Sequence, residues 1–436
     1  MRILLIAYNY PPQASPQAIR WYYLSRELAR RGAEVHVLAP DIPAQAGAAL
    51  DVPAGVTVHR CDAGGLAGWL ARAQRRRHRN GVAEPCVDAA ETEQVSGTVT
   101  LNWKGRWLQR LQRWVGLVCF PDNRGQWRRP ARAALDRLIE TLRPDILISS
   151  HEPAVTLELG LSVAARVPAW LADLGDPVLT SYTPPRWRRR AWRLEEAVCR
   201  AASVIGVTTD DTRELLRLRH GVDAAKIFVL SQGFDDSVPR MPSTEALAQG
   251  QFLHLLYSGR FYPFRDPVPL LEAVVALDRV HLTVIAPEVK PELLAYAERS
   301  GGRIVFAGEQ PHGRVLAWQR ECDVLVNIGN ALQAQVPGKL FEYLGSGKPV
   351  LHCQSADEDP AVMLLAQWGC GWVCRNEHAS LQALLAGLLA SPMQMVDAAA
   401  GNAEAIARHG WSRLGGELFE RCGRLVTLGT TTDAGH

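Results

Sequence analysis

The sequence lacks the features that mark a membrane-spanning, disulfide-rich or metal-binding chain. None of its segments has the run of about 18 or more apolar residues that a spanning helix needs. The apolar start, residues 1–7, is too short for a signal peptide and has no small-residue cleavage site after it, so we expect a buried strand of a cytoplasmic protein. The nine cysteines are scattered without a CxxC pair, which disfavours a zinc site and a disulfide framework. There is no G-x-G-x-x-G motif, so we expect no nicotinamide or flavin cofactor.

Length and charge indicate two domains of different surface character. A chain of 436 residues is too long for one ordinary core. Residues 1–240 carry 33 Lys and Arg against 25 Asp and Glu, a net charge of +8, whereas residues 241–436 carry 15 against 20, a net charge of −5. We therefore expect the first half to face an anionic surface.

Strand and helix patterns alternate along the first half and predict a doubly wound parallel sheet. Residues 2–8 read as a buried strand, residues 19–31 as a helix closed by Gly32, and residues 34–40 as a second strand. In such sheets ligands bind where loops leave the carboxyl ends of the strands, and the loop 9–17 lies at that edge.

Residues 62–120 interrupt this alternation and read as an insertion. Within it, the segment 103–118 places Trp, Leu and Val at helical spacing and Lys and Arg on the other side. A helix lying in a membrane interface has this composition, and so does a helix that packs the apolar stripe on its own domain. The segment 186–193 repeats the mixture of Arg and Trp, but no nucleic-acid-binding fold signature accompanies it.

Titratable side chains follow two successive predicted strands of the first half. One strand ends before His151 and Glu152, and the next ends before Asp173 and Asp176. Because the carboxyl ends of parallel strands lie on one edge of the sheet, we expect these four residues at one rim. Such groups are site candidates, although some of them commonly cap helices instead.

The second half contains two turns suited to phosphate. Gly259 and Arg260 follow a strand directly, and Arg265 stands before the next helix. Two arginines at one strand-to-helix turn can grip both phosphates of a nucleoside diphosphate.

The other turn leads into a short helix, residues 339–344, that starts after Pro337 and Gly338. Lys339 lies in the first helical turn, where the helix dipole disfavours a cation unless an anion binds there. Glu342, one turn later, can accept two hydrogen bonds from a ribose diol. A simple surface pair of Lys339 and Glu342 is the alternative interpretation.

The string PGKLFEYLGSGKPVL, residues 337–351, resembles the nucleotide-sugar signature of glycosyltransferase family 4, a group of enzymes with the GT-B fold. In that family the glutamate at the position of Glu342 holds the ribose of the donor. A second acid, eight positions earlier, usually contacts the transferred sugar, and this chain has Ala334 there. The order of motifs from Phe120 to Pro177 is similar to that of a subgroup acting in bacterial surface-polysaccharide assembly.

The resemblance implies two Rossmann-like domains of doubly wound parallel sheet that face a cleft. The first, residues 1–235, would bind the acceptor, and the second, residues 250–410, the nucleotide sugar. Residues 411–436 would form a helix that crosses back to the first domain.

The resemblance also implies a role for each candidate residue. Asp173 and His151 are the expected catalytic residues. The expected donor-binding residues are Gly259, Arg260, Arg265, Gly338, Lys339, Leu340 and Glu342. The expected acceptor-binding residues are Ser15, Gln17, Glu152 and Asp176.

The implied activity is transfer of a sugar from a UDP- or GDP-sugar to a hydroxyl of a glycan or polyprenyl-diphosphate-linked acceptor. The family's chemistry implies retention of the anomeric configuration without metal or cofactor. We expect a cytoplasmic protein, peripheral at the membrane if residues 103–118 bind lipid. A nucleotide-sugar epimerase of the same architecture and a non-catalytic membrane-bound partner subunit remain as alternatives.

Overall fold

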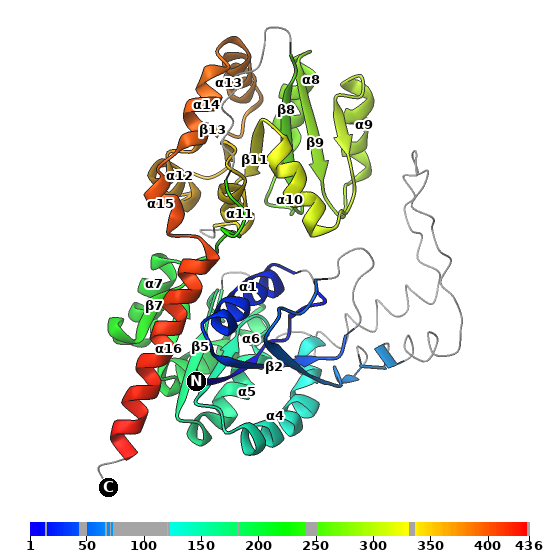
Figure 1. Cartoon of the computed structure of the whole chain (residues 1–436). Coiled ribbons are helices and arrows are strands. Elements are labelled where there is room, and N and C mark those ends of the chain that lie inside the picture. The colour runs from blue at the N-terminus through cyan, green and yellow to red at the C-terminus, as the bar shows by residue number, and fades with distance from the viewer. Residues whose placement is uncertain are drawn as a thin grey trace. The chain divides into compact units, whose positions relative to one another are not determined.

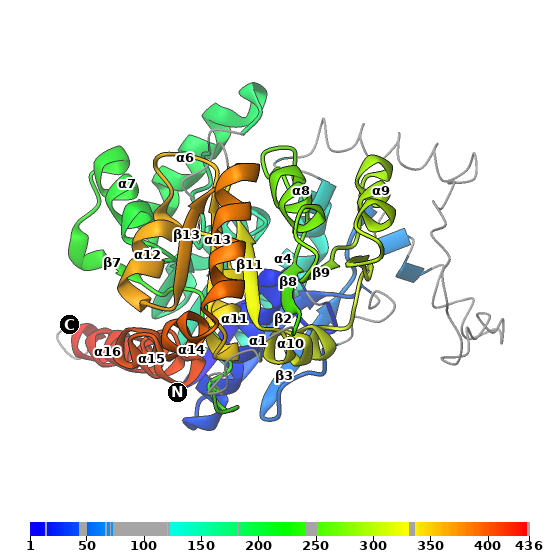
Figure 2. The same cartoon turned by 90° about the horizontal axis from the view of Figure 1, so that it is seen from above.

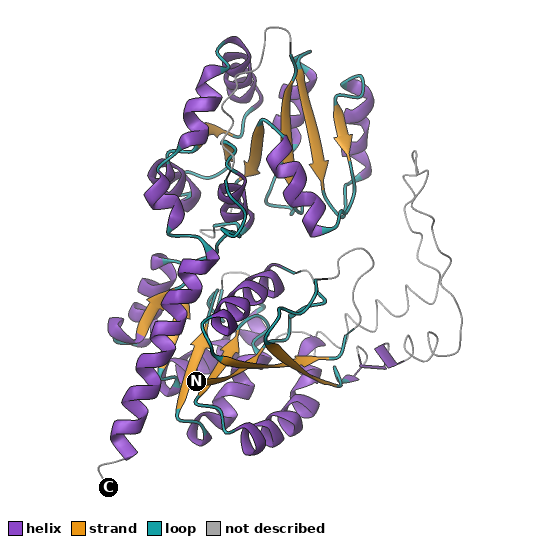
Figure 3. Ribbon diagram, in the orientation of Figure 1, coloured by secondary structure: helices purple, strands orange, loops and turns teal. Residues whose placement is uncertain are grey.

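The computed structural model describes residues 1–13, 15–42, 50–65, 68–69, 71–72, 120, 123–180, 183–240, 251–330 and 336–433. The chain divides into two compact units. The first comprises the described parts of 1–44, 50–231 and 418–436, and the second comprises those of 232–417. Each unit is built on one parallel sheet with helices on its faces (Figures 1 and 3).

The seven strands of the first sheet are ordered β3-β2-β1-β4-β5-β6-β7. The order reverses direction between β1 and β4, which gives the doubly wound topology expected from the sequence. Their bounds are β1 (Arg2–Ile6), β2 (Glu34–Pro40), β3 (Val56–Cys61), β4 (Ile146–Ser150), β5 (Ala169–Asp173), β6 (Val204–Val207) and β7 (Ile227–Val229).

Helices cover both faces of this first sheet. In Figure 1, α1 lies over one face, whereas α4 and α5 lie on the other, where α5 also contacts α6. The helical segments are α1 (Pro16–Arg30), η1 (Asn123–Trp127), α4 (Arg128–Leu142), α5 (Val155–Val163), η2 (Ala164–Arg166), α6 (Pro185–Ala201), α7 (Asp210–His220) and η3 (Ala224–Lys226).

The second sheet has six strands in the order β10-β9-β8-β11-β12-β13. Alternate residues of its strands enter two separate apolar cores, because successive side chains of a strand point to opposite faces. Leu255 and Val324 lie in one core, and Leu256 and Leu325 in the other. The strands are β8 (Leu253–Ser258), β9 (Val280–Ile285), β10 (Ile304–Phe306), β11 (Val324–Ile328), β12 (Val350–Gln354) and β13 (Gly371–Arg375).

The helices of the second unit supply the rest of these two cores. α8 packs against α9 and α13 on one face, and Figures 1 and 2 show α8 and α9 side by side. α10 contacts α11, and α12 contacts α15. The helices are α8 (Val268–Val275), α9 (Pro291–Arg299), α10 (His312–Glu321), α11 (Lys339–Ser346), α12 (Pro360–Trp368), α13 (His378–Ala390), α14 (Met393–Ala400) and α15 (Ala403–Ala407). The last helix, α16 (Trp411–Asp433), begins in the second unit, and its residues from Leu418 onward belong to the first.

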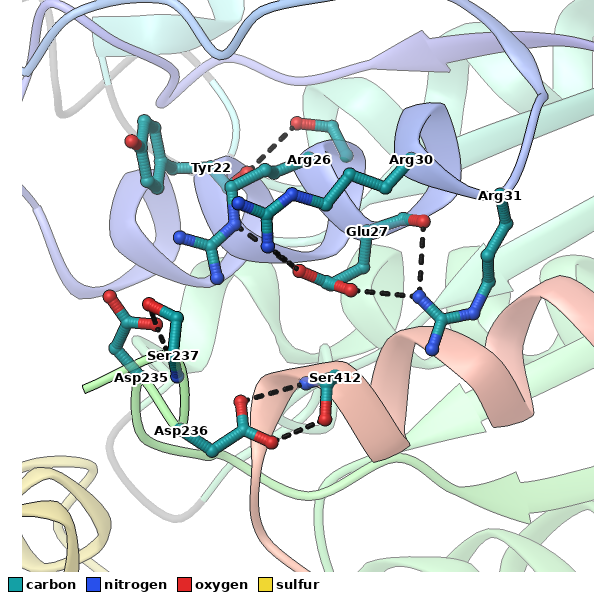
Figure 4. A network of polar contacts seen from close by, with 10 residues as sticks. Tyr22, Arg26, Glu27, Arg30, Arg31, Asp235, Asp236, Ser237 and Ser412 are labelled. Atoms are coloured by element: carbon teal, nitrogen blue, oxygen red, sulfur yellow. Dashed lines mark hydrogen bonds and ion pairs between the residues drawn. The ribbon is translucent and has the colours of Figure 1, made fainter. Parts of the chain in front are cut away.

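Charged side chains stabilise helix ends in each unit (Figure 4). In the first unit, the 3% exposed Glu27 accepts hydrogen bonds from Arg30 at 3.0 Å and Arg31 at 2.7 Å in the last turn of α1. In the second unit, Asp236 accepts a 3.1 Å hydrogen bond from the backbone N–H of Ser412 in the first turn of α16. The Asp236 contact gives a partner to a backbone N–H at the start of α16 that would otherwise lack one, whereas Glu27 pairs with side chains only.

One helix begins earlier than the sequence pattern predicts. α1 starts at Pro16 rather than residue 19, because the Ser15 hydroxyl accepts the 3.2 Å hydrogen bond of Ala18 N and Pro16 fits the first helical position. α6 starts at Pro185, so the Arg- and Trp-rich segment 186–193 is helical. Segment 103–118 lies outside the described residues.

Two glycines of the second unit provide a test of this packing. Gly371 has φ +155°, and a Cβ there would collide with the backbone of Val350, coming within 2.7 Å of its nitrogen. Gly387, within α13, has open space around it. We expect Gly371→Ala to lower the melting temperature, since strained backbone alone costs about 1–3 kcal/mol. Gly387→Ala should raise stability by about 0.5–1 kcal/mol, because alanine favours helix. Equal melting temperatures of the two variants, measured by circular dichroism, would contradict this packing.

Candidate functional site

The first part of the candidate site is the turn after β8 in the second unit. Gly259 has φ +137°, a conformation that strongly favours glycine. A Cβ on this residue would lie 3.5 Å from Cδ and 3.6 Å from Nζ of Lys339. These distances are ordinary van der Waals contacts, so the positive φ is the reason for glycine here, and the turn lies directly against the first residue of α11.

Arg265 holds this turn in place from within. Its side chain donates from Nη1 to the carbonyl of Arg260 at 3.2 Å and from Nη2 to Oδ1 of Asn330 at 2.7 Å. The Tyr257 hydroxyl donates to the same Arg260 carbonyl at 3.0 Å. Arg265 is 7% exposed, and its Nε has no hydrogen-bond partner within the part of the chain that the structure describes.

Lys339 brings a second buried cation to this turn. Its Nζ lies 3.7 Å from the centroid of the Tyr257 ring, a cation–π distance, and is buried. Among the described residues it has neither a hydrogen-bond partner nor a carboxylate within ion-pair distance. Burial lowers the pKa of Lys339 well below that of an ordinary lysine, and the positive charge of Arg265 lowers it further. Two neighbouring cations with unused donors form a site for an anion.

Glu342 lies one turn further along α11, with 23% of its side chain exposed. Its Oε1 is 3.7 Å from Nε2 of His312, the first residue of α10. Burial raises the pKa of Glu342, and the charge of His312 opposes the rise. The next residue, Tyr343, ties α11 to β8 through its hydroxyl, which lies 3.1 Å from the backbone nitrogen of Ser258.

The side chains of the other expected donor-binding residues make no hydrogen bond or ion pair with Lys339 or Arg265 within the described parts of the chain. The Arg260 side chain is exposed, and the turn uses its carbonyl rather than its guanidinium. Gly338 precedes α11, which begins without a side-chain cap. Leu340 is a core residue: its side chain is fully buried, and its N–H donates to Pro337 O at 3.0 Å. Ala334 lies outside the described residues.

Three residues of this corner were not anticipated from the sequence: Tyr257, His312 and Asn330. Tyr257 is the next-to-last residue of β8, and Asn330 lies two positions after β11, so both stand at carboxyl ends of parallel strands. That position was the available signal. His312 carries no comparable signal, because its contact with Glu342 depends on how α10 packs against α11.

In the first unit, the four expected rim residues do come together. The backbone N–H of His151 donates to Asp173 O at 2.9 Å, and Nδ1 of His151 lies 2.9 Å from Asp176 O. Burial raises the pKa of Asp176 to about 6, and the negative charge of nearby Glu152 adds to the rise. Asp176 therefore changes protonation state close to neutral pH.

Asp173 occupies a different environment from the one expected of an acceptor-binding carboxylate. It has no exposed surface, and its Oδ1 is 3.3 Å from Nη2 of Arg20, which is also fully buried. Arg20 further donates to the carbonyls of Ser231 at 2.6 Å and Leu230 at 2.8 Å. In this structure Asp173 is an internal ion-pair partner, and direct contact with an acceptor is not available to it.

Two other expected acceptor-binding residues make internal contacts. The Ser15 hydroxyl caps α1. Nε2 of Gln17 donates to the Ser150 hydroxyl at 2.7 Å and to the His151 carbonyl at 2.5 Å. Gln17 thus ties the start of α1 to the end of β4.

The described residues contain no group of three or more His, Cys, Asp or Glu side chains placed to hold a metal ion. No single described helix has the length and apolar composition to cross a membrane, although α13 and α14, bent by 101°, meet these criteria as a pair.

Comparison with known proteins gives one family match and many structural ones. Residues 69–238 match the family model described as Glycosyltransferase Family 4. A search of curated proteins found no match. HepE of Anabaena, solved in complex with UDP and glucose, is similar with a TM-score of 0.60 at 14% identity, covering 97% of this chain and 99% of that chain.

Two further solved structures have a similar fold. WaaG, a glycosyltransferase involved in lipopolysaccharide biosynthesis, has a TM-score of 0.56 at 14% identity and covers 96% of this chain and 99% of its own. A putative UDP-N-acetylglucosamine 2-epimerase from Listeria monocytogenes has a TM-score of 0.53 at 14% identity, with coverages of 96% and 94%. Identities this low show a shared fold.

The buried pair of Arg20 and Asp173 predicts a large loss of stability when one partner is removed. Asp173→Ala leaves the Arg20 charge uncompensated, so the free energy of unfolding should fall by about 3–5 kcal/mol in urea titrations followed by tryptophan fluorescence. The double variant Arg20→Met, Asp173→Leu should recover part of this loss, since no buried charge remains. Wild-type stability of Asp173→Ala would refute the internal role.

Proposed function

We propose that this chain transfers a sugar from a nucleoside diphosphate sugar to a hydroxyl of a glycan or lipid-linked acceptor, because residues 69–238 match the model of glycosyltransferase family 4 and the chain has the GT-B fold. The observation that carries the proposal is the pair of buried cations at the start of α11. The Lys339 ammonium and the Arg265 Nε are buried donors without partners in the described parts of the chain.

A donor diphosphate satisfies both groups at once. Hydrogen bonds between charged groups contribute about 1.5–3 kcal/mol each, and Gly259 leaves room for the phosphate to approach Lys339. In the reaction, the bond from the anomeric carbon to the diphosphate breaks and negative charge builds up on the leaving group. Lys339 and Arg265 stabilise that charge, which lowers the barrier.

Glu342 is the proposed partner of the donor ribose. Its carboxylate is partly exposed on the same helix as Lys339, three residues further along, and can accept both hydroxyl hydrogen bonds. UDP is the first nucleotide to test, since HepE was solved with UDP and glucose.

On the acceptor side, we assign Asp176 and Glu152 rather than Asp173. With a pKa of about 6, Asp176 is largely ionised at neutral pH and can take the proton of an acceptor hydroxyl. His151 positions Asp176 through its 2.9 Å contact with the Asp176 carbonyl. The proposed transfer retains the anomeric configuration, as the family resemblance implies.

A lipid-linked acceptor in polysaccharide assembly suits the net charge of +8 on residues 1–240. WaaG, which has the same fold, takes part in lipopolysaccharide biosynthesis. We propose that residues 103–118, which lie outside the described residues, bind the membrane surface through their Trp, Leu and basic side chains and keep the enzyme at the inner face of the cell membrane.

Epimerisation of a nucleotide sugar is the second candidate, because the fold is shared with the putative epimerase from Listeria. Such an enzyme binds the donor in the same way but needs acid and base groups beside the sugar. The position of the family's sugar-contacting acid is Ala334, which supplies neither. The third candidate is a partner subunit that binds the donor without catalysing a reaction.

Substitution of Lys339 separates ligand binding from folding. Lys339→Met removes a buried charge, so stability should be unchanged or higher, whereas UDP affinity should fall about 10- to 100-fold in isothermal titration calorimetry. The matched control is Lys348→Met, which changes a lysine just beyond the other end of α11. Equal UDP affinity of Lys339→Met and wild type would refute the site.

The lowered pKa of Lys339 also predicts how this experiment depends on pH. Between the lowered pKa and an ordinary lysine pKa, the unfolded chain binds one more proton than the folded one, so this group makes stability rise with pH. Diphosphate favours the charged ammonium, so UDP affinity should fall as pH rises through the lowered pKa, and binding should take up a proton. Calorimetry in two buffers of different ionisation enthalpy measures this uptake, which Lys339→Met should abolish.

Glu342→Ala should raise the KM for the donor about tenfold or more with a smaller change in kcat, because the ribose contact is made before and during the reaction. Glu342→Gln keeps one carbonyl acceptor and should be intermediate. Assays with several UDP- and GDP-sugars, with and without membrane lipid extract, identify the reaction. If release of nucleoside diphosphate requires lipid, the protein is the transferase. If the sugar is converted without lipid, it is the epimerase. If the donor binds but remains unchanged, it is the partner subunit.

A further inference from the structure

A pocket in the first unit is not explained by donor binding. Its volume is about 230 Å³, and it opens beside His151 and Glu152 after β4. Pockets for drug-sized ligands span about 300–1,000 Å³, so this one suits a smaller group than a nucleotide sugar.

One wall of the pocket is an aromatic pair. The rings of Phe120 and Trp187 lie 5.6 Å apart at 71°, in edge-to-face contact. The guanidinium of Arg190 lies 4.6 Å from the Phe120 centroid, and the same arginine pairs with Glu158 at 2.7 Å. These contacts fix the rings. The Trp187 indole N–H is buried without a hydrogen-bond partner in the portion of the chain described.

The opposite wall is the loop after β5, which contributes Pro177, Val178 and Thr180. The buried Glu195 anchors this loop by accepting a 3.0 Å hydrogen bond from Leu179 N, and Arg219 donates to the Leu179 carbonyl at 3.0 Å. The wall is therefore held before any ligand arrives.

The rim of the pocket is polar and carries charges of both signs. Glu152, which is exposed, and Arg124 both line it. Thr180 and Thr183 add hydroxyls 3.0 Å apart, which donate and accept hydrogen bonds. A carboxylate acceptor, guanidinium donors and hydroxyls around one small opening suit a neutral ligand with many hydroxyl groups.

We propose that this pocket binds one neutral sugar ring of the acceptor, with its apolar C–H face on Trp187 and Phe120 and its hydroxyls at Glu152. The inference rests on the proposed function and names the acceptor class: a glycan whose terminal residue is an uncharged sugar. The ring sits next to His151 and Asp176, so a neighbouring hydroxyl lies near the proposed proton acceptor.

Saturation-transfer NMR on the full chain tests the pocket with methyl glycosides of glucose, galactose, mannose and N-acetylglucosamine, each with and without UDP. At least one of these glycosides should show saturation transfer from the protein, and Trp187→Ala should weaken the binding of that glycoside about tenfold or more. Trp192→Ala is the matched control, because Trp192 is a 41% exposed indole on the same helix outside this pocket. Glu152→Gln, at an exposed position, repeats the test if Trp187→Ala fails to fold.

The outcomes separate this inference from the proposed function. Glycoside binding that depends on Trp187 but not on Trp192 supports the pocket. If UDP binds normally but no glycoside shows saturation transfer in the NMR experiment, the sugar-binding role of the pocket is overturned and the transferase proposal still stands. Binding of farnesyl phosphate that depends on Trp187, without glycoside binding, overturns it in favour of a lipid. If the wild-type chain does not bind UDP, the proposed function itself is contradicted.

Discussion

The site of the second unit depends on two buried cations that share no carboxylate. Removing an ammonium group from water is costly, and the contact of Lys339 with the Tyr257 ring offsets only about 2 kcal/mol of that cost. The part of the desolvation cost that is not offset lowers the pKa of Lys339. An unpaired buried ammonium lowers the stability of the free protein, and a bound diphosphate supplies the negative charge that this ammonium lacks. Donor binding is therefore expected to stabilise this corner as well as fill it.

The first unit contains the opposite case. Arg20 is as deeply buried as any residue in the described chain, but it has a carboxylate partner, Asp173, and donates to two backbone carbonyls. Its charge is neutralised within the fold, so the pair holds β5 and the end of β7 together. Lys339 differs because it has no carboxylate partner among the described residues. From this contrast we read Arg20 and Asp173 as a structural pair and propose Lys339 as a binding residue.

The two doubly wound parallel sheets could be predicted from the sequence, because buried parallel strands are short apolar runs separated by helical patterns. The convergence of Gly259, Arg265 and Lys339 followed from the rule that strand carboxyl ends share one edge. The burial of Asp173 could not be predicted in this way, since it depends on Arg20, which lies 153 positions earlier in the chain. Leu340 was misplaced for a similar reason: a motif identifies the helix but not which of its residues face the core. His312, Asn330 and the aromatic wall of Phe120 and Trp187 likewise arise from packing between elements distant in sequence.

A crystal structure of the full chain with bound UDP tests the central claim most directly. The account predicts a phosphate oxygen within about 2.7–3.2 Å of Lys339 Nζ, another beside Arg265, and the ribose hydroxyls at Glu342. UDP bound in an ordered site away from Lys339 and Arg265 would contradict it, because the two buried cations would then remain without the anion that explains them.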